Sequence, residues 1–124
     1  MATKKNPVVF GLTEFFGNLV ELPTSTWVDH VLVYHPEMVG HENVIQQVLK
    51  DPFEIKESTL YATGAAFISE PLLVFPEGIR VLVNYTDISY QKGAATGLIT
   101  TAYPVDLINY QRPNLGKTVY RKRK

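Results

Sequence analysis

The sequence predicts an α+β protein in which an N-terminal β segment and two helices precede a twisted antiparallel sheet of about four strands. Apolar residues recur with helical spacing between residues 27 and 50. After residue 53 the chain is rich in Val, Ile, Thr and Tyr and is divided by short turns, which favours an antiparallel meander. The length of 124 residues fits one compact domain, and a content of 45% apolar and 19% charged residues is typical of a globular chain.

The N-terminal part of the chain contains two short β-prone segments, residues 8–12 and residues 17–22. They lie on either side of a polar and aromatic stretch, and Pro23 ends the second segment. This pattern predicts either a small hairpin or an extended arm.

The first predicted helix covers residues 27–33 and follows a Thr-Ser-Thr stretch. Thr26 and Asp29 approximate a capping box, in which a side chain at each position bonds the backbone of the other. Pro36 disfavours the α conformation at His35, so we expect this helix to end or kink there.

The second predicted helix covers residues 42–50 and has the clearest amphipathic pattern in the chain. Asp51 and Pro52 end it. Its apolar face consists of Val44, Ile45, Val48 and Leu49.

The remainder of the chain is predicted to form the sheet, with residues 106–110 as a last short turn. We expect a single domain over residues 1–110 and a basic C-terminal tail over residues 111–124. The β-prone segments are residues 53–57, 60–67, 72–75, 79–85 and 97–103.

The formal net charge of zero is unevenly distributed along the chain. Residues 1–110 hold twelve acidic and six basic side chains, a net charge of −6, whereas residues 111–124 hold six basic side chains and no acidic ones. Such a tail either contacts nucleic acid or is a solvated end. The acidic body argues against a broad nucleic-acid surface but leaves room for a local basic site.

Composition also excludes several classes of protein. Without cysteine there is no disulfide scaffold, no cysteine-bound metal and no thiol nucleophile. No apolar run approaches the roughly 20 residues that span a bilayer, and residues 1–6 lack an apolar signal core, which predicts a cytoplasmic protein without membrane contact. The spacing of the three histidines is not that of a zinc protease, and neither a nucleophile elbow nor a phosphate-binding loop is present. No metal or cofactor is therefore predicted.

A series of short motifs nevertheless stands out in order and spacing. Residues 27–32 read WVDHVL, residues 34–38 read YHPEM, and residues 49–52 read LKDP. A serine and a Leu-Tyr strand come next, and residues 98–104 read LITTAYP. This series resembles the phage- and toxin-associated nucleases of the barnase–EndoU–colicin–RelE-like family over about two thirds of the chain. The resemblance implies a small endoribonuclease that needs no metal. In such an enzyme the 2′-hydroxyl of the RNA attacks the adjacent phosphate.

The resemblance assigns catalytic roles to four residues. The helix histidine of the pattern falls on His30, the histidine before Pro-Glu on His35, and the end of the late strand on Thr101 and Tyr103. RNA transesterification needs a base for the 2′-hydroxyl, an acid for the 5′-oxygen and donors for the phosphorane. Histidine suits both proton transfers because its ordinary pKa is near neutrality.

One position departs from the pattern, because Tyr34 replaces the arginine that precedes His-Pro-Glu. Arg80 or Lys56 is a candidate to supply the missing charge. Further candidate RNA contacts are Ser58, Arg80, Arg121, Lys122, Arg123 and Lys124.

Tyr34 also leaves a competing hypothesis open, a catalytically degenerate member of the fold that binds a protein through its N-terminal arm and strand edges. A third alternative is a basic-tailed nucleic-acid-binding protein without catalysis. The expected partners are RNA and a protein of the immunity or antitoxin kind. Each candidate residue also has a plain structural explanation, such as a helix-ending turn at residues 35–37 or β propensity at Thr101 and Tyr103.

Overall fold

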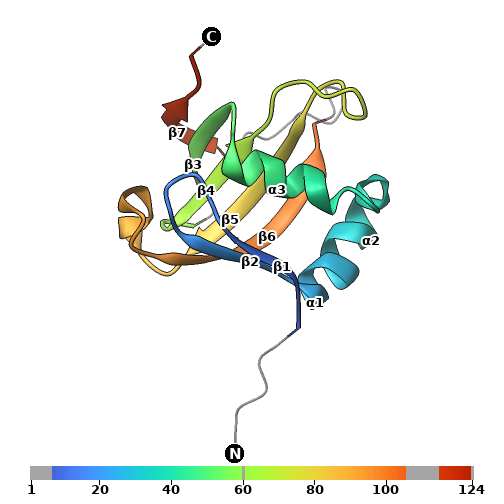
Figure 1. The fold of residues 1–124 in the computed structure, drawn as a ribbon, viewed down its shortest axis with the longest axis horizontal. Coiled ribbons are helices and arrows are strands. Elements are labelled where there is room, and N and C mark those ends of the chain that lie inside the picture. The colour runs from blue at the N-terminus through green and yellow to red at the C-terminus, as the bar shows by residue number, and fades with distance from the viewer. Residues whose placement is uncertain (1–6, 60, 106–114, 124) are drawn as a thin grey trace, which may run out of the picture.

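The computed structural model describes residues 7–59, 61–105 and 115–123. These residues form one mixed sheet of seven strands in the order β1-β2-β6-β5-β4-β3-β7, with helices on its sides (Figure 1). The strands are β1 (Val8–Thr13), β2 (Leu19–Pro23), β3 (Glu54–Ser58), β4 (Gly64–Ile68), β5 (Ile79–Tyr85), β6 (Thr96–Pro104) and β7 (Leu115–Arg121). The helical elements are α1 (Thr24–Thr26), the π turn η1 (Trp27–Val31), α2 (Leu32–Tyr34), the 3-10 turn η2 (Pro36–Met38), α3 (Glu42–Lys50) and the 3-10 turn η3 (Ile88–Lys92).

The α+β class is confirmed. The sheet, predicted to have about four antiparallel strands, has seven strands in the described residues and includes a parallel pair. The hairpin of β1 and β2 joins the sheet through a parallel pairing of β2 with β6, in which Leu19 lies opposite Thr96. Residues 115–121, assigned from the sequence to the basic tail, form β7 and pair with β3. The last turn expected at residues 106–110 lies outside the described residues.

Residues 72–75 were wrongly predicted as a strand and instead form part of the loop between β4 and β5. Their composition favours a strand, but a strand also needs a neighbour to accept its backbone hydrogen bonds. Here Pro71 and Pro76 bracket a tight turn in which the amide of Leu72 donates to the carbonyl of Phe75 at 2.9 Å. Local propensity is overridden by this turn.

The helical segment that begins at Thr24 ends at His35, where the backbone leaves the helical region with φ −136° and ψ 66°. Pro36 explains this end, as the sequence predicts. The capping box expected at Thr26 and Asp29 does not form: Thr26 is itself helical and makes no side-chain cap hydrogen bond, and the segment begins after Pro23. No helix in the described ranges is long and apolar enough to cross a membrane.

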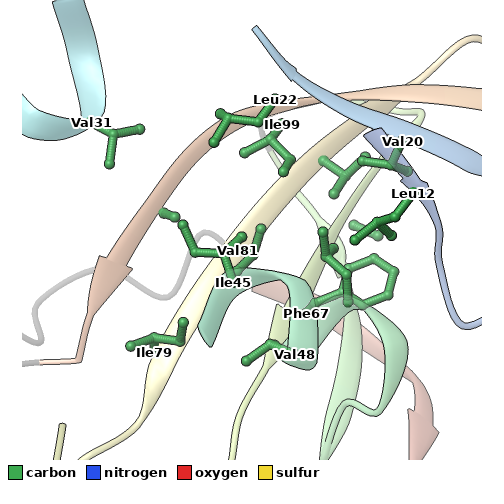
Figure 2. Packing of buried hydrophobic residues seen from close by; sticks show 14 of the residues in the cluster. Leu12, Val20, Leu22, Val31, Ile45, Val48, Phe67, Ile79, Val81 and Ile99 are labelled. Carbon is green, nitrogen blue, oxygen red and sulfur yellow. The ribbon is translucent and has the colours of Figure 1, made fainter. Parts of the chain in front are cut away.

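The hydrophobic core lies between α3 and one face of the sheet, which we call the core face (Figures 1 and 2). The amphipathic pattern of α3 buries Ile45, Val48 and Leu49 there, as predicted. In β5 the residues at odd positions from Ile79 to Tyr85 belong to this core. Because side chains alternate along a strand, Arg80, Leu82 and Asn84 lie on the opposite face.

A buried polar network holds the β1–β2 turn against the sheet. The side-chain amide of Asn18 donates to the carboxyl group of Glu14 at 3.1 Å and to the carbonyl of Tyr90 at 2.7 Å, and its oxygen accepts from the amide of Ala95 at 2.9 Å. The hydroxyl of Tyr85 donates to the same carboxyl group at 2.5 Å. Burial, and then the nearby Glu14 carboxyl, raise the pKa of Tyr85 far above its ordinary value, so this hydroxyl remains a donor.

Candidate functional site

The helical segment from α1 to η2 packs against β6, and this contact brings His35 to Tyr103. The two rings are tilted by 30° with their centroids 5.3 Å apart. The backbone of His35 is fixed on both sides, because its amide donates to Val31 at 2.7 Å and its carbonyl accepts from Met38 at 3.0 Å. The position of this imidazole is therefore set by the helix end that Pro36 imposes.

His30 lies on the exposed side of the same helical segment, five residues before His35. Its ring contacts Tyr34 with a centroid distance of 5.1 Å, as expected for residues four apart on a helix. Its charge is near enough to His35 to influence the titration of that residue. The structure thus places His30 near His35, and it is the ring of His35 that contacts β6 through Tyr103.

The pKa of His35 lies below its ordinary value of 6.5, chiefly because burial disfavours the charged ring. The carboxylate of Glu37, whose Oε1 is 4.0 Å from Nδ1 of His35, opposes this shift, while the charge of His30 adds to it. At neutral pH the ring of His35 is consequently uncharged and able to accept a proton.

Thr101 and Tyr103 lie on the face of β6 away from the core, because Ala102 between them belongs to the core. In β5 their cross-strand partners are Leu82 and Arg80 respectively. Arg80 is 8% exposed and adjoins Tyr103 directly. It is therefore the candidate cation nearest to the Tyr103–His35 contact.

Lys56, the other candidate for the missing charge, lies on β3 in the same cross-strand row as Thr101. Two strands separate them, which corresponds to about 14 Å at the usual strand spacing. Ser58 lies still farther away, at the end of β3 that pairs with Leu115. The structure does not bring either residue to the histidines.

The described cations of the predicted tail lie on or just after β7, four strand positions from β6 and near the end of α3. The guanidinium of Arg121 is 5.5 Å from the centroid of the Phe53 ring, and Nζ of Lys122 is 3.1 Å from the carboxylate of Asp51. Arg123 is exposed beside them, and Lys124 lies outside the described residues. Strand β7 thus places basic side chains beside the acidic β3 region rather than beside His35.

Sequence reasoning missed two neighbours of the histidines. Glu37 has no role in the site predicted from the sequence, although its position two residues after His35 already placed it close by. The ring of Tyr34 contacts His30, and the spacing of four residues in a helix was the available signal.

A groove of about 430 Å³ lies along the same strand β6, between β2 and β5. Leu98, in its wall, is three residues before Thr101, and both side chains face away from the core. The wall mixes apolar and polar groups: Leu19, Glu21, Asn84, Tyr85, Thr86, Thr96, Gly97 and Leu98.

Within the described ranges, no three histidine, aspartate or glutamate side chains lie close enough together to hold a metal ion. Comparison with known proteins finds no matching family model, no matching curated protein and no matching solved structure. The function of this chain must therefore be inferred from the geometry of its own side chains.

Proposed function

We propose that this protein is a small endoribonuclease that cleaves RNA by transesterification, without a metal. The observation that carries the proposal is the contact between Tyr103 and a half-buried His35 whose pKa is lowered. A neutral imidazole in contact with the ring of a tyrosine, with a second histidine five residues away, supplies groups capable of the proton transfers that this reaction needs.

In the proposed reaction His35 accepts the proton of the 2′-hydroxyl, and the 2′-oxygen forms a bond to the adjacent phosphorus. The bond from phosphorus to the 5′-oxygen breaks, and His30 donates the proton that the leaving oxygen takes up. The products are a 2′,3′-cyclic phosphate and a 5′-hydroxyl. Tyr103, Thr101 and Arg80 would stabilise the charge on the phosphorane, and the groove beside Leu98 would hold the neighbouring nucleotide.

A single-stranded RNA incubated with micromolar protein in EDTA is expected to be cleaved to products ending in a 2′,3′-cyclic phosphate. The matched control is the same oligonucleotide with 2′-deoxy sugars, which lacks the attacking hydroxyl and should stay whole. Gel electrophoresis with mass spectrometry of the fragments distinguishes these outcomes. An RNA that stays intact contradicts the proposal.

Titration of His35 tests the electrostatics of the site independently of activity. By NMR its midpoint should lie below 6.5. Glu37→Gln should lower it further, because the carboxylate favours the charged ring, and His30→Gln should raise it by removing a positive neighbour. The cleavage rate should fall as the pH drops through this midpoint, because protonated His35 no longer accepts a proton. A midpoint that both variants leave unchanged would show that the three groups do not interact.

The alternative function is that of a catalytically degenerate, protein-binding member of the fold. The specific observation in its favour is Tyr34, which stands where the family pattern has an arginine and is 67% exposed. If RNA stays whole in the cleavage assay, protein binding becomes the better-supported function.

A further inference from the structure

The loop between β4 and β5 displays two adjacent apolar side chains to solvent. Leu73 is 100% exposed and Val74 is 56% exposed. Single exposed apolar residues are common on protein surfaces, but clustered ones mark interaction sites. The wrongly predicted strand at residues 72–75 is thus an apolar run that the fold leaves uncovered.

The tip of this loop is held in place from both sides. Phe75 is buried in the core and Leu72 packs against it. The carbonyl of Phe75 accepts hydrogen bonds from the amides of Leu72 at 2.9 Å and Gly78 at 2.7 Å. Leu73 and Val74 therefore project from an ordered turn, and a partner that binds them has less conformational entropy to remove.

A third exposed apolar residue belongs to the connection before α3, which contacts this turn through His41. The ring of His41 packs edge-to-face on Phe75 with a centroid distance of 4.8 Å, and Val39, two residues earlier, is 64% exposed. Figure 1 shows the β4–β5 loop and the connection between α2 and α3 on the same side of the molecule. We call Val39, Leu73 and Val74 the apolar tip.

The charges around the apolar tip are acidic. Glu37 and Glu77 are exposed near it in sequence, and Glu42 begins α3 immediately after His41. Apart from the buried Arg80, the cations in the described ranges lie elsewhere: at the far end of α3, on β3, in η3, and on or just after β7. This charge pattern attracts basic side chains.

We infer that the apolar tip is the docking site of a protein partner that presents apolar side chains flanked by lysine or arginine. The partner's apolar groups would cover Leu73 and Val74, and its cations would lie against Glu37 and Glu77. This surface does not depend on the proposed ribonuclease activity. Because Val39 is four residues after His35, a partner bound here would also restrict access to the candidate site.

The test uses random peptides displayed on phage, selected against the purified protein. We expect enriched peptides to combine leucine or aromatic residues with lysine or arginine, and to shift the backbone NMR signals of Val39, Leu73 and Val74. The double variant Leu73→Ser/Val74→Ser should weaken binding at least tenfold. Replacing Glu37 and Glu77 with glutamine should weaken it severalfold more at low salt than at high salt.

The matched control is Ile88→Ser, which removes an exposed apolar side chain in η3 and should change binding less than twofold. Thermal unfolding of each variant shows that the fold is intact, as expected for exposed positions. Selected peptides that bind the double variant as tightly as the original chain would overturn the proposal. A selection that enriches acidic peptides, or none, would do the same.

Discussion

His35→Gln is expected to reduce the rate of RNA cleavage about 100-fold or more, because a positioned general base contributes roughly 10²–10⁴-fold to such reactions. Glutamine is similar in size to histidine but cannot accept and release a proton near neutral pH. Single-turnover kinetics under saturating protein measure the chemical step without interference from binding. The loss should appear in the rate constant at saturation rather than in the protein concentration that gives half-saturation.

His41→Gln is the matched control, because His41 is half-buried against Phe75 and has no part in the proposed proton transfers. Its rate should stay within about twofold of the original. Tyr103→Phe should reduce the rate less than His35→Gln, since only one phosphate donor is lost. If both histidine variants reduce cleavage equally, the effect of His35→Gln is structural and its proposed role is wrong.

Asn18→Leu is expected to lower the free energy of unfolding by about 3–5 kcal/mol, since it leaves several buried groups without partners at roughly 1–3 kcal/mol each. Leucine has a similar size but cannot donate to Glu14 and Tyr90 or accept from Ala95. Urea denaturation followed by circular dichroism measures the change.

Two further variants are expected to cost less than Asn18→Leu. Asn43→Ala replaces an exposed asparagine in α3 and should change the free energy of unfolding by less than about 0.5 kcal/mol. Tyr85→Phe removes one hydrogen bond to the Glu14 carboxyl group and should cost about 1–3 kcal/mol. An Asn18→Leu protein as stable as the original would mean that this network does not hold the hairpin.

Elements with a strong local signal were predicted well from the sequence. The helix at α3 follows from its apolar face, and β5 and β6 follow from runs of β-branched residues. The end of the first helix at His35 follows from the conformational effect of Pro36. Each of these signals comes from residues within a few positions of one another.

Features that depend on distant pairing were not predicted. Strand β7 carries Lys117 and Arg121, and a basic segment at the end of the sequence is typical of a solvated tail. Its pairing with β3, which contains acidic residues, is visible only in the structure. The parallel pairing of β2 with β6 has no local signature, and the exposed turn at Leu73 has the composition of a strand.

The site was predictable only as a set of candidates. The resemblance named His35 and Tyr103, but only the packing of the helical segment on β6 shows that their rings meet. Likewise, Arg80 is nearer than Lys56 to Tyr103 because β5 adjoins β6 and β3 does not. This strand order cannot be read from the residues around either cation.

The parallel pairing of β2 with β6 also has a consequence for how the chain folds. Ala95 bonds Asn18 across 77 residues of sequence, and Leu19 lies opposite Thr96 in the adjoining register. Contacts between such distant residues raise the contact order, and chains of high contact order fold slowly. During synthesis the β1–β2 hairpin has no strand to pair with until β6 leaves the ribosome. If the hairpin forms before β6 is available, the β2 edge stays unpaired, and an unpaired strand edge favours aggregation.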